Sequence, residues 1–173
     1  MKKVLCLMLV CFSFVFFGCT QNTVSNNEVV RIHIRANSNN EEDQNVKLKV
    51  RDNVINFITP LIAECNNSCD VKNVLGDNLN GIEKVADKVL EECGFKYYSN
   101  AKINNEYFPS REYGGKVFPA DYYDALILEL GSGAGDNWWC VAYPPLCFVG
   151  YESGNNIVYK SKIVELINKY FGE

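Results

Sequence analysis

The sequence has little of what metal-dependent and nucleic-acid-binding proteins need. Its 173 residues include one histidine, His33, so a metal site built from several histidines is excluded. Seventeen Lys and Arg residues stand against 21 Asp and Glu residues, and this deficit of positive charge disfavours binding to nucleic acid. There is no Cys-x-x-Cys pair and no internal repeat. We therefore expect no zinc site, no cofactor and no nucleic-acid partner.

The first 19 residues lack acidic side chains and have the pattern of an export signal. A positively charged start precedes a 15-residue apolar run, Val4–Gly18, which is shorter than the ~20 residues of a membrane-spanning helix. The run ends at Cys19 in a sequence similar to the cleavage site of bacterial lipoproteins, which makes Cys19 a candidate for lipid attachment. Cleavage without a lipid and an uncleaved anchor are the alternatives. We predict that the chain is exported and that residues 20–28 form a flexible tether.

The cysteines beyond the export signal are odd in number, so at least one is free or pairs between molecules. They are Cys65, Cys69, Cys93, Cys140 and Cys147. Cys140 and Cys147 flank a Pro-Pro turn and are the best candidates for a disulfide, because a short spacer across a turn can bring two Cα atoms within bridging distance. Two buried thiols are the alternative.

Hydrophobic spacing predicts one α+β domain over residues 29–151. Alternation over residues 30–35 predicts a strand with Arg31, His33 and Arg35 on a solvated outer face. A capping box at Ser38–Glu41 begins a first helix, in which Pro60 predicts a kink or a break. A second helix is expected from about residue 71 to residue 93, with lower helical propensity in its first half at two glycines.

The second half of the chain is rich in aromatic residues and predicts a mainly antiparallel sheet. Strands are expected near residues 98–105, 116–118, 125–130 and 138–143, and a helical tail over 152–173. The glycine-rich segment Gly131–Asp136 could pass for a phosphate-binding loop, but such a loop must lead into a helix. Since strand-like residues follow it, we predict a hairpin loop there.

Both tryptophans of the chain, Trp138 and Trp139, are neighbours. Adjacent strand residues point to opposite faces, so one indole can anchor the core while the other faces outward. An outward indole beside the Pro144-Pro145 turn has the composition of a binding hot spot. Burial of both indoles under loops is the alternative.

Several segments together resemble the stage II sporulation protein R family. In chain order they are Arg35–Ser38, Glu42–Gln44, Leu48–Asp52, Tyr107–Pro109, Phe118–Ala120, Tyr123–Leu126, Asn137–Cys140 and Pro144–Phe148. The resemblance covers roughly residues 29–150 in the order and spacing of the family, and its most specific part runs from Trp138 to Cys147. It departs from the family at both ends, in the export signal and in the tail beyond residue 151.

The resemblance implies a signalling protein rather than an enzyme, made in the forespore of an endospore-forming bacterium. It implies export into the space between the forespore and mother-cell membranes. Lipid attachment at Cys19 would hold the chain at a membrane surface through its N-terminus. The implied partner is the membrane-embedded aspartic protease that processes the precursor of sigma factor E. We place the protease contact, as a hypothesis, at Trp138, Trp139, Pro144, Pro145 and Phe148, with Arg31 and Arg35 as polar contacts.

Two other classes of function fit the residues. An exported hydrolase would use Cys140 or Cys147 as thiolate and His33 as base, and would lose all activity without that histidine. A lipoprotein-type module that binds a small ligand or the cell wall would be stabilised by its ligand.

Overall fold

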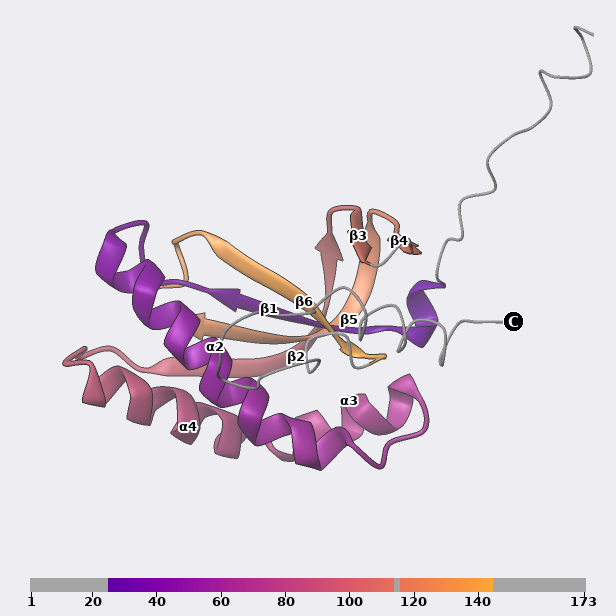
Figure 1. Cartoon of the computed structure of the whole chain (residues 1–173), viewed down its shortest axis with the longest axis horizontal. Helices are drawn as coiled ribbons and strands as arrows, with labels where there is room; N and C mark the ends of the chain where they lie inside the picture. The colour runs from indigo at the N-terminus through magenta and orange to yellow at the C-terminus, as the bar shows by residue number, and fades with distance from the viewer. Residues whose placement is uncertain (1–24, 114–115, 145–173) are drawn as a thin grey trace, which may run out of the picture.

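The computed structural model describes residues 25–113 and 116–144, which form an α+β fold (Figure 1). A 3-10 turn, η2 (Asn26–Glu28), leads into strand β1 (Val30–Arg35) and three helices. The helices are α2 (Glu41–Ile62), α3 (Ser68–Asp77) and α4 (Leu79–Glu92). The strands that follow are β2 (Ser99–Phe108), β3 (Arg111–Tyr113), β4 (Lys116–Phe118), β5 (Asp121–Leu130) and β6 (Asn137–Tyr143). The predicted C-terminal helix lies outside the described residues.

The main sheet is mixed, with the strand order β2-β5-β1-β6. β1 pairs in parallel with β5 and antiparallel with β6, while β2 pairs antiparallel with β5. The predicted order of elements is therefore wrong in placing one strand ahead of a mainly antiparallel sheet. The first strand is instead a central member of the sheet. β3 and β4 form a separate two-stranded sheet.

The helices cover one face of the sheet (Figure 1). Ile32 and Ile34 of β1 point to this face and lie in one buried cluster with residues of all three helices. Leu126 and Leu128 of β5 pair with them in register and belong to the same cluster. This cluster is the larger of the two hydrophobic clusters and holds the helices to the sheet.

The predicted second helix is in fact two helices, because the chain turns at Asn78. The Asn78 side-chain amide donates to the Val74 carbonyl at 2.8 Å, and its backbone N–H donates to Leu75 O at 3.2 Å. These bonds satisfy carbonyls at the end of α3 that an uninterrupted helix would have satisfied with later backbone N–H groups. Asn78 therefore ends α3 although the helical spacing of apolar residues continues into α4.

The first helix begins and ends differently from the prediction. Its N-cap is Asn40, whose side chain accepts from the Asp43 backbone N–H at 2.7 Å. The predicted capping box is wrong, because Ser38 Oγ bonds the Asp43 carboxylate instead. The helix continues past Pro60 and ends two residues later at Ile62.

The predicted hairpin loop at Gly131–Asp136 is also wrong. It connects β5 to β6, and these strands lie on either side of β1, so the loop crosses the end of β1. Gly135 N donates to Ala36 O at 2.8 Å, and a Cβ at Gly135 would lie 2.3 Å from the Ser38 carbonyl oxygen. A glycine is required there because two backbone segments approach too closely for any side chain. A strand, not a helix, follows the loop, which agrees with the rejection of a phosphate-binding site.

Candidate functional site

The side of the sheet that faces away from the helices carries a dense set of charged and aromatic side chains. We call this the network face and define it by Arg31, His33, Arg35, Lys102, Glu106, Glu129 and Trp139. Its residues come from all four strands of the main sheet. In β1 and β5 they alternate with the apolar residues that face the helices.

Arg31 lies at the centre of this face and is fully buried. Its guanidinium carbon is 4.5 Å from the centre of the Phe108 ring and 5.1 Å from that of the Tyr123 ring. His33 is only 5% exposed and contacts Phe108 and Trp139 edge-on or tilted, with ring centres 5.7 and 5.6 Å apart. The prediction of a solvated face is therefore wrong for these two residues, since aromatic side chains of β2, β5 and β6 cover a central strand.

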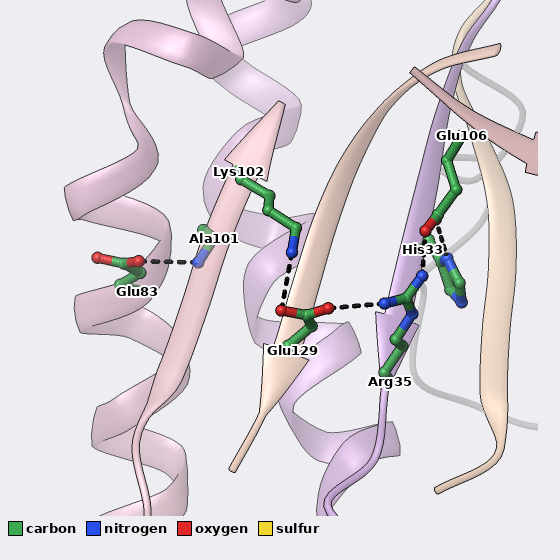
Figure 2. A network of polar contacts seen from close by, with 7 residues as sticks. All are labelled: His33, Arg35, Glu83, Ala101, Lys102, Glu106 and Glu129. Carbon is green, nitrogen blue, oxygen red and sulfur yellow. Dashed lines mark hydrogen bonds and ion pairs between the residues drawn. The ribbon is translucent and has the colours of Figure 1, made fainter. Parts of the chain in front are cut away.

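A chain of ion pairs runs over the network face (Figure 2). His33 Nδ1 is 2.6 Å from one oxygen of Glu106, and the other oxygen accepts from Arg35 Nη2. Arg35 Nη1 also donates to Glu129 at 2.6 Å. The two carboxylates thus bridge three strands, because β5 lies between β1 and β2.

Lys102 of β2 completes the chain by donating to Glu129 Oε2 at 2.9 Å. The hydrogen bond from Lys102, together with the charge of Arg35, lowers the pKa of Glu129, although partial burial opposes this. Glu129 is therefore held ionised between two cations. These two charge-assisted hydrogen bonds hold the long side chains of Arg35 and Lys102 in place on the network face.

The two sides of the sheet separate the residues of the Cys-His hydrolase alternative. His33 pairs in register with Trp139 and lies on the network face, whereas Cys140 pairs with Ile32, whose side chain faces the helices. Cys140 is disulfide-bonded and so offers no thiolate. Cys147 lies outside the described residues, and the Cys140–Cys147 pairing stays a prediction. Cys65, Cys69 and Cys93 are free.

The two tryptophans take opposite faces of β6, as the alternation predicts. Trp139 lies on the network face with the Arg111 guanidinium 5.2 Å above its ring. Trp138 packs against the helix-side cluster, with the Arg51 guanidinium 5.5 Å from its ring. Both indoles are half-buried, so each packs against a cluster and keeps part of its surface exposed.

The remaining predicted contact residues that the structure describes differ in burial. Arg31 and Pro144 are buried, which removes both from direct contact with a partner, whereas Arg35 keeps 25% of its side chain exposed. Pro145 and Phe148 lie outside the described residues. Sequence reasoning missed Arg111 because a single exposed arginine beyond a proline carries no local signal.

Within residues 25–113 and 116–144, no helix is long and apolar enough to cross a membrane. The same residues contain no cluster of three or more side chains suited to hold a metal ion.

Comparison with known proteins gives one consistent result. The family model described as Stage II sporulation protein R matches residues 26–153. Stage II sporulation protein R of Bacillus subtilis (strain 168) is 33% identical over 137 residues, which cover 79% of this chain and 61% of that protein. The chain therefore matches less than two thirds of the length of this relative. No solved structure matches.

Proposed function

This chain belongs to the stage II sporulation protein R family, and from that premise we propose that it is an exported signal that activates a membrane-embedded aspartic protease. The protease is the one that processes the sigma factor E precursor, so that activation couples transcription in the forespore and the mother cell. The observation that carries the proposal is the family match over residues 26–153, which includes the whole described domain from β1 to β6. The apolar segment ahead of the match suits a protein that acts outside the cytoplasm.

The accessible part of the network face suits a docking role. The Arg111 guanidinium lies over the Trp139 ring on this face. Arg35 lies on the neighbouring strand β1, two residues after His33, which pairs in register with Trp139. Tryptophan and arginine are the residues most enriched in binding hot spots. Docking would activate the protease if the active arrangement of the protease binds this face more tightly than the inactive one.

The state of Cys140 supports a protein without hydrolase chemistry. A disulfide sulfur cannot act as the nucleophilic thiolate, and His33 lies on the opposite side of the sheet from Cys140. The His33–Glu106 pair then has a positioning role, in which it holds the ring beneath Trp139.

The proposal predicts that the chain activates the protease only when it is exported. The sigma factor E precursor and the protease would be co-expressed in a non-sporulating host with the full chain, with a chain lacking residues 1–18, or with neither. We expect cleavage of the precursor only with the full chain, because the chain without the export segment stays on the wrong side of the membrane. Immunoblotting of the precursor measures the result. No cleavage in cells where export of the chain and the presence of the protease are both verified would contradict the proposal.

The hydrolase alternative makes a different prediction for His33. We expect the His33→Gln variant to support precursor cleavage to within about twofold of the unsubstituted chain, since a glutamine amide can still donate to Glu106 and retains hydrogen bonding in a buried site. A catalytic base would be lost completely in the same variant. The same co-expression assay, with the amount of exported protein as control, separates the two: complete loss of cleavage by folded His33→Gln protein would favour catalysis.

A further inference from the structure

β2 is an edge strand of the main sheet, and half of its outer edge is open. It pairs with β5 over all ten residues in one unbroken antiparallel register, from Ser99 opposite Leu130 to Phe108 opposite Asp121. In such a ladder, alternate residues direct their N–H and C=O groups away from the neighbouring strand. Exposed groups of this kind are a template for another strand unless the protein covers them.

Helix α4 covers the first part of this edge with two carboxylates. The Ser99 N–H donates to Asp87 at 2.6 Å. The Ala101 N–H donates to Glu83 Oε1 at 2.8 Å, as Figure 2 shows. These two bonds identify the residues whose backbone groups point outward. By the same alternation, the outward residues in the rest of the strand are Ile103, Asn105 and Tyr107.

The outward N–H groups of Ile103, Asn105 and Tyr107 have no hydrogen-bond partner among the described residues. The segment contains no proline, no lysine and no bulge, and its one charged side chain, Glu106, is paired with His33 and Arg35 of its own chain. At its far end Pro109, the first residue after Phe108, has no N–H to offer. The open edge is thus limited by Ala101, with its N–H bonded to Glu83, and by Pro109.

These two limits are symmetrical about Asn105, which lies four residues from each. A second copy of the strand, turned antiparallel about a two-fold axis at Asn105, would place Asn105 opposite itself and Ile103 opposite Tyr107. All three outward residues of each copy would then donate and accept a backbone hydrogen bond. Pairing would stop in both directions where Ala101 of one copy meets Pro109 of the other.

From this symmetry we propose that Ile103–Tyr107 of β2 is a self-association edge, through which two copies of this protein join their sheets. The proposal goes beyond activation of the protease and does not depend on it. Such a contact is isologous, the commonest symmetry of protein dimers. It turns two four-stranded sheets into one continuous sheet.

The side chains along the edge are compatible with this pairing. Tyr107 is 56% exposed and would lie against the half-buried Ile103 of the second copy. Glu106 would lie opposite Asn104, so no like charges meet, and its carboxylate is already paired with His33 and Arg35 of its own chain. The open edge is short, so we expect a weak dimer that needs a high local concentration.

Cysteine cross-linking of the full exported chain tests the axis directly. In the Asn105→Cys variant the two new thiols lie on one face with Cα atoms about 5.5 Å apart, within the range that a disulfide bridges. In the matched control, Asn104→Cys, the two Cα atoms are roughly 8 Å apart because the register separates them along the strands. We expect a disulfide-linked dimer on a non-reducing gel for Asn105→Cys and only the background of the unsubstituted chain for Asn104→Cys.

A second variant shows whether the backbone edge makes the contact. Tyr107→Pro removes an outward N–H that β5 does not use, so the sheet itself should form. Added to Asn105→Cys, it should abolish the cross-link, whereas Tyr107→Ala should leave it. Equal cross-linking at residues 104 and 105, no cross-link at residue 105, or a cross-link that survives Tyr107→Pro would each overturn the proposal.

Discussion

Replacing Asp43 by alanine is expected to lower the free energy of unfolding by about 3–5 kcal/mol. Asp43 is 2% exposed and stands in the first turn of α2. Tyr97 Oη donates to one of its oxygens at 2.5 Å, while Ser38 Oγ and Asn37 Nδ2 donate to the other at 2.6 and 2.9 Å. Truncation would leave three donors from two separate segments without their acceptor.

Urea denaturation of the purified protein measures this effect, with Asp77→Ala as the matched control. Asp77 is also a helical aspartate, but it is exposed, so its loss should change the free energy of unfolding by less than about 0.5 kcal/mol. A loss for Asp43→Ala no greater than that for Asp77→Ala would contradict the assignment of Asp43 as the junction of α2, the loop after β1 and the segment before β2.

Acid should weaken the protein partly through the same carboxylate. Burial alone would raise the pKa of Asp43, but hydrogen bonds from Ser38, Tyr97 and Asn37 outweigh it and hold the pKa below the ordinary 3.8. Because the pKa is lower in the folded chain, the stabilisation is complete above the ordinary value and is lost as the pH falls through the lowered one. Asp43→Asn, which cannot titrate, should lack this part of the acid dependence.

The local elements of this fold are predictable from sequence because their signals are local. The spacing of apolar residues predicts α2, and alternation bounded by glycine and proline predicts β4 at Lys116–Phe118 and most of β6. The sheet order is different in kind. β1 is central only because β5 and β6 fold against it from about 100 residues later in the chain, and no local pattern specifies that pairing.

The same limit explains the errors on the network face. Alternation in β1 correctly separates Ile32 and Ile34 from Arg31 and His33, but it does not reveal that aromatic residues of other strands cover the basic side. Glu106 contacts His33 across a separation of 73 residues, so no local sequence pattern around either residue indicates the pair. The family resemblance could supply the identity of the chain but not these contacts.

Alanine at Trp139 is expected to abolish activation of the protease, whereas alanine at Trp138 is not. Trp139 lies on the network face beneath the Arg111 guanidinium, and no described helix covers this face, while Trp138 packs against the helix-side cluster. Loss of a central tryptophan from an interface commonly costs 2 kcal/mol or more, which is about a 30-fold loss of affinity. The two variants are matched controls for each other, because both remove a tryptophan from β6.

The co-expression assay measures the effect as cleavage of the sigma factor E precursor, and the amount of exported variant controls for folding. Trp138→Ala should lower stability through lost packing and still activate wherever the protein accumulates. Trp139→Phe should restore part of the activation, because a smaller ring can still lie beneath the Arg111 guanidinium. Normal cleavage with Trp139→Ala would move the docking surface away from the network face. Loss with Trp138→Ala at normal protein levels would place it on the helix side, since the two indoles share a strand but no surface.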